Sequence, residues 1–497
     1  MASAPVRKKR ITLFTGHLTG SNTVLLYKYM PEDIARKYDV HLEAFKSYDK
    51  MSEETRNSDV FVTTHGNHPA LGDKILIELW HGFPLKCMAN MDIDEPATQE
   101  DIAKYWQNVD LIMSYSDTYN TLFNACMGSH VDKYRVTGMP RNDALFAADS
   151  RQKMRRVLGT DYAGTRIVYY MPTFRQSSFH AHESDGRRHW FNPFGFDAFD
   201  TESFRQFLEE QRITLIVKLH PFEEELAKEH IARFGHPRLV LLTGEMLTNS
   251  GIDLYEILGA SDALITDYSS VYFDYLLLDK PILFTPVDLE EYRRKRGFLL
   301  QPYELWTPGP KVLDQDTLQA ELIRSLNDRG YYREERERIA RIVHTYRDGQ
   351  SSLRVWKAID EYLERGGRSP ARMEDELESL KSKMASYLTK LIEAGQIEQA
   401  KSAFGRYAQT VPLNAELLTV RAVLQYVEGN YPQAIEDLMR AHHMDSTNFD
   451  TLYNLAHIFD QIGDRICALH YYQKAGRHCA DSELLKSIET RIAELQA

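Results

Sequence analysis

Short apolar runs recur through the first part of the chain, and segments with helical spacing separate several of them. Five of these runs predict strands, at residues 11–16, 59–64, 74–80, 109–114 and 134–138. Strands that alternate with helices are typical of a parallel sheet that helices cover on both faces. The pattern therefore predicts a doubly wound α/β domain over residues 1–155.

A second alternating series begins at residue 166. Its predicted strands lie at residues 166–170, 213–219, 239–242, 263–265 and 281–284. This series predicts a second doubly wound domain over residues 156–370, with a cleft between the two domains. The connection from Gln176 to Asp197 is long for a segment without secondary structure. We expect this connection to form a lid or an acceptor-facing loop rather than core.

From about residue 371 onward the strand signals stop and the spacing of apolar residues becomes helical. Three glycines and three alanines each recur at intervals of 34 residues, at Gly395, Gly429, Gly463, Ala400, Ala434 and Ala468. Small residues at a 34-residue period are the signature of tetratricopeptide repeats, in which two antiparallel helices approach closely. Residues 371–497 are therefore predicted to form an all-α repeat domain, and an irregular helical bundle is the alternative.

The segment 261–275 carries the strongest local signal for chemistry. Its apolar run ends in small polar residues, and an aromatic-rich helical pattern follows. A strand, a tight turn and a helix start together offer free backbone N–H groups to a phosphate. Ser269 and Ser270 can cap the helix and add hydroxyl donors. An ordinary capped turn is the alternative.

Two histidines follow predicted strands directly. His81 stands between Trp80 and Gly82, where α/β proteins place catalytic groups, and an imidazole suits a general base. His220 follows a strand of the second domain and could donate to a phosphate or to a leaving group. A structural histidine is the alternative at each position.

Four further polar segments could contribute to a site. Arg175 lies just past a strand and suits bidentate phosphate recognition, with a surface salt bridge as the alternative. Arg141 and Asn142 belong to a polar turn that is either structural or part of the cleft. Acidic residues within 288–293 could bind ribose or glycerol hydroxyls, or simply begin a helix. The segment 347–352 precedes a helix and is predicted to face an anion, although capping would explain it equally well.

Composition narrows the class of protein. The net charge of −12 and the pI near 5.9 argue against a dedicated nucleic-acid binder, which should present a basic face. The four cysteines lack zinc spacing and are predicted to be buried free thiols in a reducing cytosol. The sequence contains neither an apolar run of about 18 residues nor a signal-peptide core. These features predict a cytoplasmic protein, and we expect no essential metal.

Six blocks in order resemble the CDP-glycerol glycerophosphotransferases of the teichoic-acid polymerase type. The blocks are W-H-G-x-P-L-K at 80–86, G-x-P-R-N-D at 138–143, P-T-F-R at 172–175, K-x-H-P at 218–221, T-D-Y-S-S…D-Y at 266–275 and D-L-E-x-Y…R-G-F at 288–298. Each block alone is weak, but six in order with fitting spacing are specific. The resemblance covers about residues 11–365.

The resemblance implies a GT-B-like pair of doubly wound α/β domains, here followed by the tetratricopeptide region, with the active site in the cleft. It implies CDP-glycerol or CDP-ribitol as donor substrate and a hydroxyl of a polyol-phosphate or glycan acceptor, with cell-envelope polymers or their linkage units as products. We expect no cofactor besides the donor substrate. The family's two important histidines carry over onto His81 and His220. Donor and phosphate binding carries over onto Arg175, Thr266, Asp267, Ser269, Ser270, Asp274 and Glu291. Acceptor or cleft positions carry over onto Gly82, Lys86, Arg141 and Asn142.

Some alternatives stay open. The repeat region is not part of the family's core pattern, so a capsule or lipopolysaccharide chain is an alternative acceptor. A GT-B glycosyltransferase that uses a nucleotide sugar, or a related epimerase, is the competing activity. The repeats could bind a protein partner or a second copy of the chain, on an active enzyme or on a scaffold with an inactive transferase half. Because such acceptors are usually lipid-linked, we expect a peripheral position at the inner face of the cell membrane.

Overall fold

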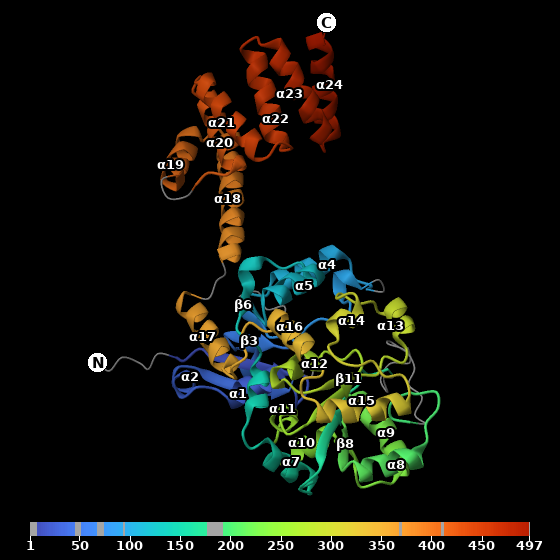
Figure 1. The fold of residues 1–497 in the computed structure, drawn as a ribbon. Helices are drawn as coiled ribbons and strands as arrows, with labels where there is room; N and C mark the ends of the chain where they lie inside the picture. The colour runs from blue at the N-terminus through green and yellow to red at the C-terminus, as the bar shows by residue number, and fades with distance from the viewer. Residues whose placement is uncertain are drawn as a thin grey trace, which may run out of the picture. The chain divides into compact units, whose positions relative to one another are not determined.

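The computed structural model describes residues 7–44, 51–66, 74–92, 95–175, 192–366, 370–408 and 412–496. The chain divides into two compact units, Met1–Ser369 and Pro370–Ala497. Figure 1 shows that the first unit contains two sheets, each with its own helices, and that the second unit is built from helices. We call the two sheet-containing parts of the first unit the first lobe and the second lobe.

A six-stranded parallel sheet forms the centre of the first lobe, in the order β2-β1-β3-β4-β5-β6. Its strands are β1 (Arg10–Thr15), β2 (Asp39–Ala44), β3 (Val60–Thr63), β4 (Ile75–Glu78), β5 (Leu111–Ser114) and β6 (Tyr134–Val136). The sequence pattern missed β2, which pairs with β1 from Arg10 to Thr15. This strand lies at the edge of the sheet and is only partly buried, so it lacks the continuous apolar run that marks the others.

Short helices separate and follow these strands along the chain. They are α1 (Asn22–Lys28), α2 (Glu32–Lys37), α3 (Glu53–Arg56), η2 (Ala89–Met91), α4 (Gln99–Gln107), α5 (Asp117–Met127), η3 (Val131–Lys133), α6 (Pro140–Asp143), η4 (Ala144–Phe146) and α7 (Ser150–Leu158). Local sequence sets several of their ends. Thr98 and Asp101 form a capping box at the start of α4, and Gly128 ends α5 with a φ of 67°.

The second lobe contains a five-stranded parallel sheet in the order β11-β10-β7-β8-β9. Its strands are β7 (Arg166–Tyr170), β8 (Ile213–Val217), β9 (Leu239–Leu241), β10 (Ala263–Thr266) and β11 (Ile282–Phe284). Its helices are α8 (Thr201–Glu210), α9 (Pro221–Phe234), α10 (Gly244–Ser250), α11 (Leu254–Leu258), α12 (Val271–Tyr275), η5 (Leu276–Leu278), α13 (Leu289–Lys295), α14 (Tyr303–Trp306), α15 (Gln315–Asn327) and α16 (Arg333–Val343). The predicted pair of parallel-sheet domains is therefore confirmed.

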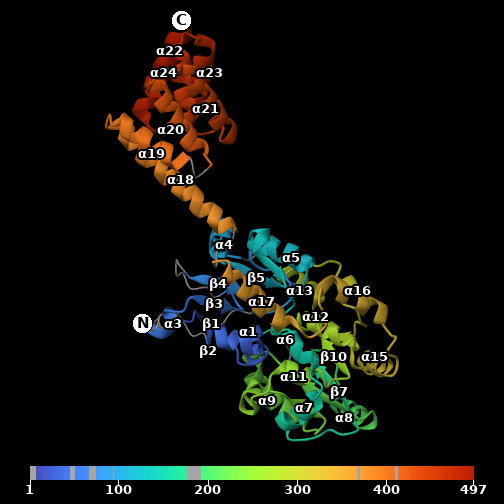
Figure 2. The ribbon, with the colours of Figure 1, turned by 90° about the vertical axis from the view of Figure 1, so that its left-hand side faces the viewer.

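Helix α17 (Ser351–Glu364) returns from the second lobe to the first. Figure 1 and Figure 2 both show it beside the first sheet, where Val355, Trp356 and Ile359 pack among the core residues of β1 and β3. The Trp356 indole Nε1 donates to the Leu26 carbonyl at 3.0 Å. A helix within the predicted second domain thus completes the core of the first lobe, and the predicted boundaries at 155/156 and 370/371 stay predictions.

The connection predicted as a lid lies partly outside the described residues, at 176–191. Its described end belongs to the core, contrary to our expectation. The Asn192 Oδ1 accepts from the backbone N–H groups of three residues that follow it, including Phe194 and Phe196. This turn buries both phenylalanine rings to 2% and 1% exposure, and the Phe194 ring lies 4.9 Å from that of Tyr170.

Helices alone make up the described part of the second unit, as expected of an all-helical region. They are α18 (Pro370–Glu393), α19 (Ile397–Ala408), α20 (Ala415–Val427), α21 (Tyr431–Met444), α22 (Phe449–Gln461), α23 (Arg465–His478) and α24 (Ser482–Gln496). The three periodic glycines all have positive φ, and the three periodic alanines are fully buried. Glycine accepts the left-handed backbone that each turn requires, and alanine permits close helix packing. The tetratricopeptide assignment stays a prediction.

Two further expectations from composition can be compared with the structure. Among the helices built from described residues, none is both long and apolar enough to cross a membrane. All four cysteines are free, but only Cys126 is buried. The expectation of buried thiols was therefore wrong for the other three, which are half-buried.

Candidate active site

A cavity of about 770 Å³ opens where β4 ends in the first lobe and where the turn at Ser269 and Ser270 begins in the second lobe. We call this turn the serine turn. His81, Gly82 and Lys86 line it from the first lobe, and Phe174 and Ser270 line it from the second. The structure therefore brings together predicted residues that are separated by almost 190 positions in the sequence.

The contacts of His81 fix which ring nitrogen can accept a proton. Its Nδ1 lies 3.1 Å from the Thr64 carbonyl oxygen. Because a carbonyl can only accept, Nδ1 carries the proton and Nε2 keeps its lone pair. The residue is open to solvent on the cleft side, but protein crowds the ring and lowers the pKa of His81 well below 6.5, with nearby His65, Arg141 and Lys86 acting in the same direction. His81 is therefore a neutral imidazole with a free acceptor.

A buried carboxylate holds the turn that carries His81. Glu78 is fully buried, and it accepts from the Trp80 backbone N–H at 2.6 Å, the Gly66 backbone N–H at 3.1 Å and the Thr63 hydroxyl at 2.5 Å. These bonds hold Trp80 at a φ of 53°, which a bulky residue adopts only when its surroundings impose it. The sequence analysis missed Glu78, although a lone acid within an apolar strand is a visible signal.

A row of histidines links His81 to His220. The His65 ring stacks on the His81 ring with centroids 4.6 Å apart, and the His17 ring lies 6.0 Å from His65 and 6.1 Å from His220. Burial lowers the pKa of His17 and His65, and burial together with neighbouring positive groups lowers the pKa of His220 to about 4. His17 and His65 were not predicted as site residues, although each lies two residues beyond the end of a strand.

The serine turn differs from the prediction in one respect. Helix α12 has only five residues, and Ser270, at its N-cap position, makes no side-chain capping bond. The prediction that Ser270 caps this helix was therefore wrong. Its hydroxyl instead lies at the interface of the lobes, where a Cβ added to Gly82 would come within 2.7 Å of the Ser270 Oγ. Among the described residues that line the cavity, Ser270 is present and Ser269 is not.

Arg175 is part of a buried ion network rather than a surface salt bridge. Its guanidinium lies 3.0 Å from carboxylate oxygens of both Asp267 and Asp288. The rings of Tyr268 and Tyr292 lie 5.1 and 5.2 Å from it. The two carboxylates raise the pKa of Arg175 above its ordinary value against the effect of burial. A phosphate would have to displace one of these carboxylates, and the predicted phosphate contact stays a prediction.

Two other predicted donor residues also make contacts within the protein. The Asp267 Oδ1 accepts from the backbone N–H groups of Thr173 and Tyr268, at 2.7 and 2.5 Å. The Thr266 hydroxyl donates to the Met171 carbonyl at 2.7 Å. Both residues therefore tie β10 to the end of β7, behind the serine turn.

The predicted cleft residue Arg141 joins the two lobes. Its guanidinium donates to Asp274, which is fully buried, at 2.6 Å. The hydroxyls of Tyr115 and Tyr255 donate to the same carboxylate at 2.9 and 2.7 Å. This network fixes the first lobe against α12 through three hydrogen bonds to one carboxylate, although the buried Nε of Arg141 makes no hydrogen bond with the described residues.

The polar turn 138–143 also supplies the anion that segment 347–352 was predicted to face. The Asp143 carboxylate accepts from the backbone N–H groups of Ser351 and Ser352, at 2.7 Å each. The expected anion at the start of α17 is therefore this carboxylate. Asn142, in the same turn, is buried.

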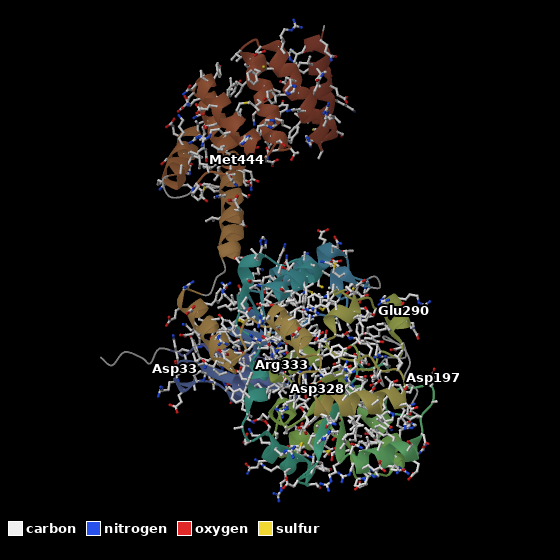
Figure 3. All side chains as sticks on the ribbon, in the orientation of Figure 1. Asp33, Asp197, Glu290, Asp328, Arg333 and Met444 are labelled. Atoms are coloured by element: carbon white, nitrogen blue, oxygen red, sulfur yellow. The ribbon has the colours of Figure 1, made fainter. Side chains whose placement is uncertain are left out.

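Glu291 lies in a different cavity. This second cavity has a volume of about 420 Å³, and Arg175, Asp267, Asp288 and Glu291 line it together with Asp197, which Figure 3 labels. The Glu291 carboxylate pairs with Lys295 at 2.6 Å. The structure thus places some predicted residues at one cavity and some at the other, whereas His220 is among the described lining residues of neither. Within the described residues, no group of three or more His, Cys, Asp or Glu side chains could hold a metal ion.

Relatives of the chain are named as teichoic acid polymerases and primases. A teichoic acid poly(ribitol-phosphate) polymerase of Bacillus spizizenii is 26% identical over 286 residues, which cover 56% of this chain and 42% of the relative. The ribitol-phosphate polymerase TarK of Staphylococcus aureus is 27% identical, with 49% and 44% covered. A teichoic acid glycerol-phosphate primase of B. spizizenii is 27% identical, with 66% and 79% covered. The chain thus spans less than half the length of the two polymerases and most of the primase.

The fold has a solved counterpart. The structure of the wall teichoic acid polymerase TagF superposes with a TM-score of 0.57 at 20% sequence identity, covering 72% of this chain and 89% of that chain. This likeness confirms the predicted GT-B-like arrangement of the two lobes. The sequence pattern of one family, described as CDP-glycerol:poly(glycerophosphate) glycerophosphotransferase, matches residues 23–361, more than half of the chain. The chain therefore belongs to this glycerophosphotransferase family.

Proposed function

We propose that this protein transfers glycerol phosphate or ribitol phosphate from a CDP-activated donor to a hydroxyl of a cell-envelope acceptor and releases CMP. Membership of the family supports the type of reaction. The observation that carries the proposal is the proton-accepting Nε2 of His81 in a cavity that Lys86 and Ser270 also line. In a displacement at phosphorus, a neutral imidazole can accept the proton, and ammonium and hydroxyl groups can stabilise the charge.

The reaction is a single displacement. The acceptor oxygen attacks the phosphorus that bears the polyol and forms a new P–O bond. The bond from that phosphorus to the bridging oxygen breaks, and CMP leaves with the bonding electron pair. The acceptor hydroxyl proton passes to the Nε2 of His81, so atoms and charge balance.

Lys86 and Ser270 in the cavity, together with His220 beside the cavity residue Phe174, stabilise the phosphates. The Lys86 ammonium lies 5.8 Å from the ring centroid of Phe174, and the His220 ring lies 4.8 Å from the same ring. At neutral pH His220 is uncharged and binds a phosphate oxygen by donating one N–H, since its pKa is about 4. We assign the charge stabilisation to Lys86 and the hydrogen bonds to His220 and Ser270. Arg175 acts indirectly, by holding the serine turn in place.

We also propose a location for the enzyme and a role for its second unit. A lipid-linked acceptor would place the enzyme at the inner face of the membrane. The helical second unit would then bind a protein partner or a second copy of the chain, as repeats of this kind do.

A donor panel tests the reaction class. The full chain is incubated with CDP-glycerol, CDP-ribitol or UDP-N-acetylglucosamine, and release of CMP or UDP is followed by chromatography. We expect CMP from at least one CDP-polyol, with mass spectrometry showing the polyol phosphate on the acceptor. UDP release without CMP release would contradict the proposal and favour a glycosyltransferase.

A further inference from the structure

The active-site cavity extends well beyond His81. We define its outer arm as the part bordered by η2, α4 and α5. The lining residues of the outer arm are Met88, Ala89, Asp92, Glu95, Ala97, Asp101, Ile102, Tyr105, Trp106, Met127 and Arg296. Figure 1 and Figure 2 show α4 and α5 side by side at this end of the first lobe. The walls of the arm are mostly apolar, so its occupant must present an uncharged face as well as polar groups.

Aromatic rings connect the arm to His81. The Trp80 ring lies 4.3 Å from the His81 ring and 5.9 Å from Trp106, and Trp106 lies 5.2 Å from Phe123. Trp106 is only 4% exposed, whereas the neighbouring Tyr105 is 43% exposed. Tyr105 therefore exposes an accessible aromatic ring next to the buried ring of Trp106. Such a face packs against the apolar C–H face of a sugar ring.

The charge of the arm disfavours a phosphate chain. Its lining carries three carboxylates, from Asp92, Glu95 and Asp101, against one guanidinium from Arg296. Arg296 already pairs with Asp92 at 2.8 Å. Two carboxylates therefore remain without a balancing cation among the described lining residues of the arm. Carboxylate oxygens accept hydrogen bonds from sugar hydroxyls, but they repel the phosphodiesters of a polyol-phosphate polymer.

We propose that the outer arm binds a neutral sugar of the acceptor, so that the hydroxyl presented to His81 belongs to a glycan and not to a polyol-phosphate chain. This inference rests on the proposed function and names its acceptor class. The bonds made and broken are those of the displacement above, with a sugar hydroxyl as the attacking group. The product is a glycan that carries polyol phosphate, and further extension of a phosphate chain is disfavoured.

Two acceptors of similar length test the proposal. The full chain and CDP-glycerol are mixed with neutral N-acetylglucosamine oligosaccharides or with a glycerol-phosphate oligomer, and CMP release is measured. We expect stimulation by the neutral glycan alone. Stimulation by the oligomer alone, equal stimulation by both, or stimulation by neither above the rate of donor hydrolysis would overturn the acceptor class. A complete lack of CMP release would instead count against the proposed function.

Substitution of Tyr105 tests the aromatic face. Tyr105→Ala should raise the KM for the glycan by about fivefold and leave kcat unchanged, since it removes stacking and leaves the reacting groups in place. The control is Tyr27→Ala, on α1 of the same lobe, because Tyr27 is 39% exposed and lies outside the cavity. Equal KM values in the two variants would contradict the assignment.

Substitution of Glu95 tests the charge. Glu95→Lys should raise kcat/KM for the glycerol-phosphate oligomer relative to the glycan by about tenfold, since it replaces repulsion with attraction. Its control is Asp33→Lys, on α2 of the first lobe, which Figure 3 labels. An unchanged ratio in Glu95→Lys, or the same change in Asp33→Lys, would refute the electrostatic part of the proposal.

Discussion

The carboxyl ends of the two sheets carry polar residues in similar positions but use them differently. At the end of the first sheet, His81 and Lys86 face a cavity. At the end of the second sheet, Arg175 and Asp267 face one another at 3.0 Å, and Asp288 completes the group. The comparison separates the side chains that line the cavity around His81 from an ion network that holds strand ends of the second lobe together.

The difference follows from burial. Arg175 is 3% exposed, and a charge that is so removed from water requires opposite charges and hydrogen bonds within the protein. His81 avoids this requirement because the protein atoms crowded around its ring lower its pKa and leave it uncharged, although the residue is open to solvent. An uncharged base needs no charged partner in a crowded cleft before a substrate binds, whereas a buried guanidinium does.

The largest effect is expected from Arg175→Met. The substitution leaves two carboxylates close together without their cation, so the free energy of unfolding should fall by about 3–5 kcal/mol. Urea denaturation measures this fall. The control is Arg293→Met, which breaks an exposed pair with Glu290 (Figure 3) and should change the stability by less than about 1 kcal/mol. Similar values for both variants would remove the distinction between the two sheet ends.

The second-largest effect is expected from Glu78→Gln. An amide can replace only part of the acceptor set of Glu78, so one backbone N–H would face an N–H₂ group. We expect a loss of about 1–3 kcal/mol in stability and a fall in kcat as the turn at Trp80 and His81 loosens. Activity and thermal unfolding should be measured together, with the exposed Glu53→Gln as control. A stable variant with normal kcat would show that Glu78 does not position His81.

A smaller effect is expected from Ser270→Ala. Because the Ser270 hydroxyl makes no capping bond, its loss should change the stability by less than about 0.5 kcal/mol. If the hydroxyl binds a donor phosphate, CMP release should fall by about tenfold. Ser269→Ala is the matched control and should keep most of the activity. The opposite ranking of the two serines would move the phosphate contact to Ser269.

The last effect is a dependence of stability on pH. The pKa of His220 is about 4 in the folded protein, against an ordinary value of 6.5. Between these values the unfolded chain binds more protons, so stability falls as the pH drops from 6.5 towards 4, by at most about 1.4 kcal/mol per pH unit for one group. Denaturation midpoints at pH 7 and pH 5 should therefore differ less in His220→Asn than in the unmodified chain. Equal differences would contradict the lowered pKa.

The strands show what local patterns can predict. The bounds of β7, Arg166–Tyr170, were predicted to the residue, since an apolar run flanked by polar residues marks a buried strand. The edge strand β2 was missed because partial burial weakens that pattern. Local sequence therefore indicates how deeply a segment is buried more reliably than it indicates pairing at an edge.

The site shows what such patterns leave out. Motifs located His81 and His220, but the partners of Arg175 lie 92 and 113 positions away in the sequence, so nothing local revealed that its charge is balanced. The row through His65 and His17 exists only because strand ends converge in the parallel sheet. Spatial convergence of distant residues decides which polar groups face a substrate.

The rate of CMP release by His81→Ala tests the central claim most directly. The full chain, CDP-glycerol as the proposed donor and a saturating acceptor are used, and donor binding is measured separately by calorimetry. If the Nε2 of His81 accepts the hydroxyl proton, turnover should fall by about a hundredfold or more while donor affinity stays nearly the same. Turnover close to that of the unmodified chain would contradict the account.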